Sequence, residues 1–231
     1  MRAIIFANGS LRFSQVVNQH APLRSDDIVI AADGGAHHCL TLGIHPRFVI
    51  GDLDSLGKEE LSQLHALGSE IIQHPRRKDY TDLELALRYA QELGADEILI
   101  LGALGERWDQ TIANILLPAV LSPVTYRNAV KKPPSITILD DNQELFFLLG
   151  GEQLEIHGEP GDVVSLIPIA QRVRGVTTQN LEYPLKAEDL LLGSTLGISN
   201  VLLGDHGSVS FIEGLMLCVV IHQIYQLKVE E

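Results

Sequence analysis

The sequence predicts an α/β protein in which an N-terminal doubly wound, mostly parallel sheet is followed by a C-terminal all-β sandwich. In the first part of the chain, short apolar runs typical of buried strands alternate with amphipathic helical segments, which is the pattern of parallel α/β sheets. After the segment Lys131–Pro134, short β-rich runs are closely punctuated by glycine and proline, as in all-β domains. We therefore expect two domains, residues 1–130 and 135–231.

The expected strands of the first domain are apolar runs bounded by turn residues. They span residues 2–7, 27–32, 48–50, 70–73 and 97–101. The expected helices between them carry apolar stripes and end at glycine. They span residues 36–42, 58–67 and 81–93. The last of these is the clearest, because Thr81 and Glu84 have capping-box spacing and Gly94 follows the stripe.

A fourth helix is expected after the turn at residues 102–105, with Asp109 as its N-terminal cap. Its apolar stripe consists of Ile112, Ile115, Leu116 and Ala119. Pro118 should kink or end this helix, because proline has no amide hydrogen to donate to the helical ladder.

The second domain is expected to contain seven short strands. They span residues 135–139, 144–149, 153–156, 163–168, 173–178, 190–192 and 209–211. The apolar segment 214–226 is expected to be either a strand or a helix, because periodicity alone does not separate the two when both are buried.

The overall composition excludes several classes of partner. The chain has 231 residues and a formal net charge of -13, from 30 acidic and 17 basic residues, which argues against a nucleic-acid or anionic-membrane surface. No apolar run is long enough to span a bilayer, and the N-terminal run is too short for a signal peptide. Cys39 and Cys218 lie far apart in sequence, so we expect reduced thiols in a cytoplasmic protein rather than a disulfide framework.

The most informative short segment is Gly51-Asp52-Leu53-Asp54-Ser55, which directly follows an expected strand. The glycine allows a tight turn, and two carboxylates follow at i and i+2. Such a pair is costly at the mouth of a strand unless a cation lies there, and Mg²⁺ is suited because it takes oxygen ligands and keeps water and phosphate oxygens. The alternative is a plain surface turn, because Gly, Asp and Ser are all turn residues.

Further carboxylates are expected along the same edge of the sheet. Asp33 follows the strand at 27–32, and Asp109 lies a little beyond the strand at 97–101. Ligands of doubly wound sheets bind outside the carboxyl ends of the strands. Together with Asp52 and Asp54, these acids are hard to explain by solubility alone.

Two strand-to-helix connections carry cations suited to phosphate. Lys78-Asp79-Tyr80-Thr81-Asp82 begins a helix, whose unpaired amides can hold phosphate beside the charge of Lys78. Asp82 could instead simply favour the helix dipole. The turn Gly102–Asp109 contains glycines that permit close backbone approach, and Arg107 suits bidentate phosphate contact. The alternative for this turn is an ordinary connection with an exposed arginine.

The adjacent histidines His37 and His38 do not predict a metal site, because neighbouring residues of a helix point in different directions. We expect His38 to be structural or exposed. The sequence also contains no Walker phosphate loop and no Gly-x-Ser-x-Gly elbow.

Eight segments, taken in order, resemble the thiamine pyrophosphokinases and together cover nearly the whole chain. They are Ala32–Ala36, Gly51–Ser55, Lys78–Asp82 and Gly105–Asp109 in the first half, and Gly161–Leu166, Gly175–Thr178, Leu181–Leu185 and Gly197–Asn200 in the second. Three positions depart from the family pattern. The family often has Asn where His37 stands, usually Gly where Glu106 stands, and frequently His where Gln110 stands.

The resemblance implies a homodimer with active sites between subunits, and the reaction of ATP with thiamine to give thiamine diphosphate and AMP. The thiamine hydroxyl would attack the β-phosphorus, so that the diphosphate moves as a unit. The resemblance implies Asp52, Asp54 and Asp82 as Mg²⁺ ligands. Lys78 and Arg107 would neutralise phosphate charge, since phosphoryl chemistry depends mostly on positioning and charge stabilisation.

The resemblance also implies residues that bind the two substrates. The set expected around ATP is Asp33, Gly34, Gly35, Lys78, Asp79, Thr81, Arg107 and Asp109. Within it, Asp33 and Asp109 would orient the loops or bind water on the metal. Ser199 and Asn200 would contact the aminopyrimidine of thiamine.

Three alternative functions are kept beside this one. A related pyrophosphokinase could act on another alcohol such as a pterin, and a Mg²⁺-dependent nucleotide hydrolase would use water in place of the alcohol. A non-catalytic sensor would bind thiamine or a nucleotide without turnover. The acidic set argues against a sensor, because binding alone would not need so many carboxylates.

Overall fold

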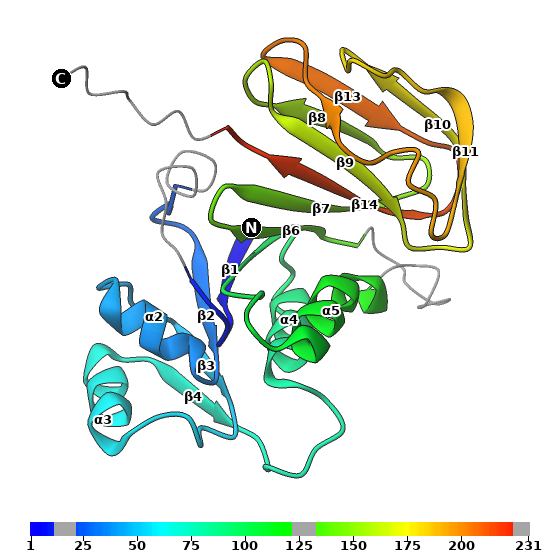
Figure 1. The fold of residues 1–231 in the computed structure, drawn as a ribbon. Helices are drawn as coiled ribbons and strands as arrows, with labels where there is room; N and C mark the ends of the chain where they lie inside the picture. Colours follow the sequence, from blue (N-terminus) through cyan, green and yellow to red (C-terminus); the bar gives the residue numbers. More distant parts are fainter. Residues whose placement is uncertain (12–21, 122–132, 224–231) are drawn as a thin grey trace, which may run out of the picture. The chain divides into compact units, whose positions relative to one another are not determined.

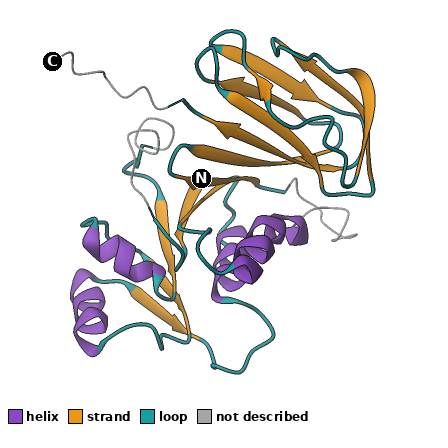
Figure 2. Cartoon of the chain, viewed as in Figure 1, coloured by secondary structure: helices purple, strands orange, loops and turns teal. Residues whose placement is uncertain are grey.

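A computed structural model describes residues 1–11, 22–121 and 133–223. The chain divides into two compact units, Met1–Asp141 and Asn142–Glu231. Figure 1 gives the element labels and Figure 2 the distribution of helix and strand. Within the described ranges, no helix is long and apolar enough to cross a membrane.

The first unit contains six parallel strands in the order β6-β5-β1-β2-β3-β4. Their bounds are β1 Arg2–Phe6, β2 Ile28–Ala32, β3 Phe48–Gly51, β4 Glu70–Gln73, β5 Glu97–Leu101 and β6 Ser135–Asp140. The central strands are buried on both faces, as the continuous apolar runs predicted. The mostly parallel sheet expected from the sequence is therefore confirmed.

Helices cover both faces of this sheet (Figures 1 and 2), so the unit is doubly wound. The α-helices are α2 Gly35–Thr41, α3 Lys58–Leu67, α4 Asp82–Glu92 and α5 Trp108–Leu116. Ala36 and Cys39 of α2 and Leu64 of α3 join one buried cluster with strand side chains such as Phe6. The buried stripe of α4 packs on β1, β2 and β3, and Phe48 of β3 meets Tyr89 of α4 edge to face.

The helix expected to begin at Asp109 differs from the prediction. Arg107 occupies the N-cap position of α5, and Asp109 lies in the first turn. Two of the expected stripe residues are exposed, Ile112 by 54% and Leu116 by 45%. The sequence could not predict this exposure, because apolar periodicity indicates which residues share a helix face but not what covers that face. The helix does end before Pro118, and a 3-10 turn, η1 Leu117–Leu121, continues the chain.

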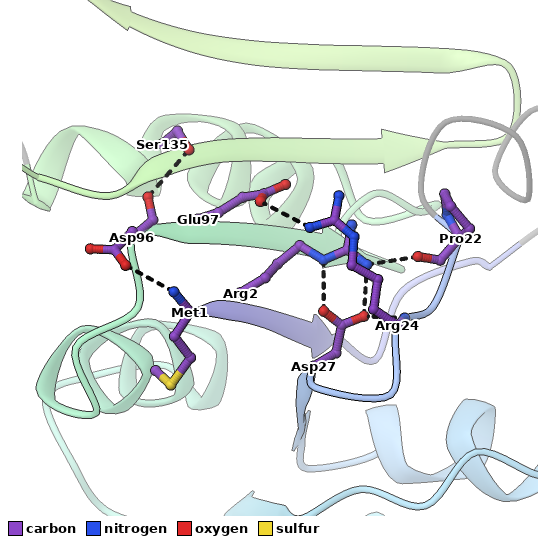
Figure 3. Close-up of polar contacts among 8 residues, drawn as sticks. All are labelled: Met1, Arg2, Pro22, Arg24, Asp27, Asp96, Glu97 and Ser135. Carbon is purple, nitrogen blue, oxygen red and sulfur yellow. Dashed lines mark hydrogen bonds and ion pairs between the residues drawn. The ribbon is translucent and has the colours of Figure 1, made fainter.

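A buried ion pair joins β1 to the start of β2, at the opposite end of these strands from their carboxyl ends (Figure 3). Arg2 donates from Nε and Nη2 to the two oxygens of Asp27 at 2.8 and 2.7 Å, and also to the carbonyl of Pro22 at 2.7 Å. Burial raises the pKa of Asp27, but the hydrogen bonds and charges of Arg2 and Arg24 outweigh it and leave this pKa below its ordinary value. The amino-terminal end of the sheet is thus pinned by polar contacts.

The second unit contains two antiparallel groups of strands, in the orders β12-β9-β14-β7 and β11-β10-β13-β8. The first group comprises β7 Gln143–Leu149, β9 Val163–Pro168, β12 Asn200–Val201 and β14 Leu215–Ile221, and the second comprises β8 Gln153–His157, β10 Arg172–Gln179, β11 Lys186–Leu191 and β13 His206–Ser210. One buried cluster draws side chains from both groups, including Val164, Val176 and Met216. This confirms the all-β second domain.

The structure resolves two uncertainties of the sequence in this half. The apolar segment 214–226 contains strand β14, although its last residues lie outside the described ranges. The strand expected at 135–139 is present as β6, but it pairs in parallel with β5 and belongs to the first unit. The division of the chain therefore follows Asp141 rather than Lys131–Pro134, because a β-rich run predicts a strand without predicting its partner.

A buried cluster of ionisable groups lies inside the second unit. His222, directly after β14, places Nδ1 2.8 Å from Asp162 Oδ2 and Nε2 2.8 Å from Glu144 Oε1. All three side chains are nearly removed from solvent. Burial lowers the pKa of His222, but Glu144 and Asp162 outweigh it and raise this pKa above its ordinary value. The cluster joins the ends of β7 and β14 to the loop before β9.

Candidate active site

Three carboxylates converge at the carboxyl end of the parallel sheet. Asp33 follows β2, Asp52 follows β3 and Asp82 begins α4, and they offer oxygens that all lie within 4.8 Å of one another. Asp33 is 6% exposed, and its Oδ1 has no hydrogen-bond partner among the described residues. Grouped carboxylates with a buried, unpartnered oxygen fit a hard divalent cation such as Mg²⁺.

Gly51 provides the space that lets these acids approach. A Cβ atom at this position would lie 2.9 Å from the Asp33 Cβ and 3.1 Å from Asp82 Oδ1. Both distances are shorter than ordinary van der Waals contact, so any larger residue would push the acidic side chains apart. The absence of a side chain at Gly51 therefore allows carboxylates from neighbouring elements to lie close together.

Lys78 is the cation that faces this group. Its Nζ lies 3.0 Å from Asp82 Oδ1 and 3.4 Å from Asp52 Oδ2. Partial burial lowers the pKa of Lys78, but Asp82 and Asp52 together outweigh it and raise this pKa. Burial also raises the pKa of Asp82 against the opposing effect of Lys78, so the charged form of that carboxylate benefits from any further cation.

Asp54 lies outside the group of three. Its carboxylate is 45% exposed and pairs with Arg76 at 3.1 Å. Its backbone amide donates to Asp52 Oδ1 at 3.2 Å, which is the largest cause of the lowered pKa of Asp52. The structure thus brings Asp33, which the sequence placed in a supporting role, next to Asp52 and Asp82, and turns Asp54 toward the open side.

A cleft of about 780 Å³ opens beside these acids within the first unit. Residues at its wall include Asp33, Asp54, Lys78, Thr81, Asp82 and Arg107. Thr81 accepts the amide of Glu84 and so caps α4, which fixes the start of the helix that carries Asp82. Asp79 is exposed and is not part of the wall.

Arg107 also lines this cleft and pairs with Asp109. Its Nη2 lies 2.5 Å from Asp109 Oδ2 and its Nε 3.2 Å from Oδ1, and both side chains are about two-thirds exposed. The turn before it is tied down by Thr111, whose hydroxyl donates to the carbonyl of Gly105 and accepts from its amide. Glu106 also lines the cleft.

The glycines of the Asp-Gly-Gly segment serve packing. A Cβ at Gly34 would lie 2.3 Å from the side chain of Asn8, and one at Gly35 would lie 1.9 Å from the carbonyl of Phe6. These glycines let the start of α2 lie directly against the chain that leaves β1. Sequence reasoning treated Asn8-Gly9-Ser10 only as a turn, but all three residues line the cleft because β1 is central in the sheet.

Ser199 and Asn200 lie in the second unit and differ in exposure. Ser199 is exposed, with φ of 59°, and its amide donates to the hydroxyl of Ser165. Asn200 is buried, and its carboxamide donates to the carbonyl of Tyr183 and accepts from the amides of Tyr183 and Val201. The side chain of Asn200 is therefore engaged in holding the backbone.

Comparisons with known proteins agree with this architecture. Residues 20–124 match the family model "Thiamin pyrophosphokinase, catalytic domain", and residues 153–216 match "Thiamin pyrophosphokinase, vitamin B1 binding domain". A thiamine pyrophosphokinase of Bacillus subtilis is 32% identical over 190 residues, which cover 82% of this chain and 85% of the relative. The chain belongs to the thiamine pyrophosphokinase family.

A plant relative and a solved structure also cover most of the chain. Thiamine pyrophosphokinase 1 of Arabidopsis thaliana is 28% identical over 225 residues, which cover 87% of this chain and 79% of the relative. The crystal structure of a Bacillus subtilis thiamine pyrophosphokinase superposes with a TM-score of 0.81 at 28% identity, covering 97% of this chain and 100% of that one. The match to the thiamine pyrophosphokinase catalytic domain spans every acid and cation of the candidate site, and the match to the vitamin B1 binding domain includes Ser199 and Asn200.

Proposed function

We propose that this member of the thiamine pyrophosphokinase family transfers the diphosphate group of ATP to the hydroxyl of thiamine, giving thiamine diphosphate and AMP. The observation that carries the proposal is the convergence of Asp33, Asp52 and Asp82 beside a cleft with Lys78 and Arg107 on its wall. Carboxylates that can hold a divalent cation and nearby side-chain cations are the parts that phosphoryl transfer needs.

Asp52 and Asp82 hold Mg²⁺ in this proposal, and Asp33 supplies the buried third oxygen. Asp54 adds a further carboxylate from the open side of the cleft, after release from Arg76. Bound Mg²⁺ would neutralise charge on the phosphate oxygens and fix their position. The unpartnered Asp33 oxygen and the close approach at Gly51 support this assignment.

Lys78 and Arg107, which both line the cleft, bind the phosphates. Lys78 acts as a point charge, held ready by Asp52 and Asp82. Arg107 offers a planar fork that matches two phosphate oxygens, and in the free protein Asp109 occupies this fork. When phosphate binds, it therefore replaces Asp109 as the anionic partner of Arg107. Before that, Asp109 keeps the guanidinium oriented.

Thiamine is bound through the second unit, with Ser199 as its exposed polar contact. Asn200 contributes in two ways: it contacts thiamine directly, and its hydrogen bonds to Tyr183 and Val201 hold the segment that carries Ser199 in place. We further propose a homodimer with active sites between subunits and a cytoplasmic location. The homodimer is supported by exposed apolar side chains in the second unit, including Leu192, Leu196 and Ile212. The cytoplasmic location is supported by the buried free thiols of Cys39 and Cys218.

The decisive experiment measures AMP release with ATP, Mg²⁺ and a panel of alcohols. AMP should appear only when thiamine is present, together with one equivalent of thiamine diphosphate. AMP formed with water alone would indicate a nucleotide hydrolase, and AMP formed preferentially with a pterin alcohol would change the acceptor. The match to a vitamin B1 binding domain favours thiamine over another alcohol, and the match to a pyrophosphokinase catalytic domain favours diphosphate transfer over hydrolysis and over a sensor.

A further inference from the structure

His37 of α2 joins the acidic loop to the start of α3. Its Nδ1 lies 2.5 Å from Glu60 Oε1, and its Nε2 lies 3.0 Å from the carbonyl oxygen of Ser55. The other oxygen of Glu60 accepts the amide of Gly57 at 2.8 Å, which satisfies the backbone amide of the N-cap residue of α3. One imidazole therefore contacts both the residue after Asp54 and the cap of a neighbouring helix.

The two partners of the imidazole are both hydrogen-bond acceptors. A neutral imidazole has one donor nitrogen and one acceptor nitrogen, so it can satisfy only one of these contacts. A carbonyl oxygen has no hydrogen to give, and an ionised carboxylate has none either. Both contacts form together only when both ring nitrogens carry hydrogen, that is, when His37 is an imidazolium.

The loop that His37 contacts has a backbone that needs support. Leu53, between the two acids of the loop, has φ of 64°, which is uncommon for a residue with a branched side chain. Such a conformation persists only where surrounding contacts determine it. Leu53 and Leu56 supply apolar contacts, each 9% exposed in the buried cluster of this face. The bond from His37 to Ser55 is the polar contact that ties the same loop to α2.

We propose that His37, through contacts at both ring nitrogens, is a positioning residue that clamps the acidic loop between α2 and α3 and so holds Asp52 in the geometry that binds the divalent cation. This inference rests on the proposed function for the role of Asp52. Glu60 is the carboxylate in contact with the ring, while Lys58 and Glu59 of the same helical turn are exposed. The neighbouring His38 is engaged elsewhere, with the carbonyl of Gly9.

The clamp predicts that removing the imidazole lowers affinity for the cation, because the acidic loop then loses its hydrogen bond to α2.

The test measures Mn²⁺ affinity of the full chain, with and without an ATP analogue that carries a methylene bridge between the α- and β-phosphorus atoms. His37→Ala and Glu60→Gln should each weaken Mn²⁺ about tenfold, which is the lower end of the effect of a residue that orients metal ligands. The double variant should be no weaker than the stronger single variant, because both changes break one clamp. At saturating Mg²⁺, kcat should change less than about threefold.

His65→Ala is the matched control, because His65 is an exposed histidine on α3. It should leave Mn²⁺ affinity unchanged. Affinities within twofold of the parent chain in both clamp variants would overturn the inference, and so would a loss that follows a general loss of folded structure by circular dichroism. If the parent chain does not release AMP with thiamine but the variants still differ in Mn²⁺ affinity, the proposed function fails and the clamp stands.

Discussion

At the scale of single residues, the acids of the site differ in their access to water. Asp33 is buried with an unpartnered oxygen, Asp52 receives the amide of Asp54, and Asp54 itself is nearly half exposed. A buried carboxylate oxygen without a hydrogen-bond partner destabilises the folded protein, so it is expected where the carboxylate has a function such as cation binding. Asp33 and Asp54 both line the cleft, and they differ in that Asp33 is buried whereas the Asp54 side chain is 45% exposed.

Asp33→Asn should make the metal-free protein more stable and weaken its response to Mg²⁺. Asparagine tolerates the left-handed backbone at this position, where φ is 46°, and it removes the repulsion from Asp52 and Asp82. We expect a gain of about 1 kcal/mol in unfolding free energy without metal, as for other stabilising changes at functional sites. Urea titrations with and without Mg²⁺ would measure both effects. A less stable metal-free variant would show that Asp33 is structural.

Asp54→Asn should lower turnover at least about a hundredfold, by analogy with the loss of a major electrostatic stabiliser. The change keeps the size of the side chain, and its exposed position predicts little effect on stability. Glu92→Gln, an exposed acid of α4, is the control and should retain full activity. Steady-state AMP release would be measured for both chains. A near-normal rate for Asp54→Asn would remove this residue from the metal site.

At the scale of elements, the second unit relies on a buried charge cluster where strands end. His222, Glu144 and Asp162 connect β14, β7 and the loop before β9. Asp162 also accepts hydrogen bonds from the amides of Glu159 and Gln223. Its carboxylate therefore connects the loop before β9 to the chain that follows β14. Breaking such a cluster leaves buried charge without compensation.

His222→Gln should lower the unfolding free energy by about 3 kcal/mol at pH 6, the range for breaking a buried ion pair. The raised pKa of His222 means that its stabilising contribution is present below the unfolded value, about 6.5, and is lost as pH rises through the folded value. The difference between parent and variant should therefore shrink as pH rises above about 6.5. Urea unfolding across this range would measure it.

The control for this experiment is His206→Gln in the same unit, because the His206 side chain is 67% exposed. Its effect on stability should stay within about 0.5 kcal/mol at each pH. If the loss of unfolding free energy caused by His222→Gln grew as pH rose, the result would contradict the charge state assigned to the cluster.

At the scale of the whole molecule, the proposed homodimer places thiamine contacts and phosphate contacts on different subunits. Asp52→Asn removes a metal ligand, and Ser199→Lys places a cation where the thiamine cation should bind. Ser199 already has φ of 59°, so another unbranched side chain adds little backbone strain. Each chain alone should be nearly inactive. A random mixture should recover about a quarter of the normal sites, because about half of the dimers are mixed and each has one intact site.

Activity of mixed chains would be measured after exchange of subunits is verified with two differently tagged chains. Recovery should follow the fraction of mixed dimers as the mixing ratio is varied. No recovery, with both chains folded by circular dichroism, would show that each active site is built within one chain.

The sequence by itself determined the α/β and all-β halves, the family, and the segments that carry the chemistry. Residues 58–67 and 70–73 were predicted to the exact bounds of α3 and β4, since apolar periodicity and glycine stops are local properties. The cap at Thr81 follows from local spacing in the same way. Family segments in order indicate the activity, because their residue types and spacing can be read directly along the chain.

Only the tertiary structure decided which residues meet. It assigned β6 to the first unit, turned the apolar face of α5 outward, and engaged Asn200 inside the second unit. It also brought Asp33 beside Asp52 and Asp82, and it joined His37 to Ser55 and Glu60. Spacing along a chain predicts the face on which a side chain lies, but contacts between elements depend on strand order and on the packing of helices against the sheet, which local sequence does not encode.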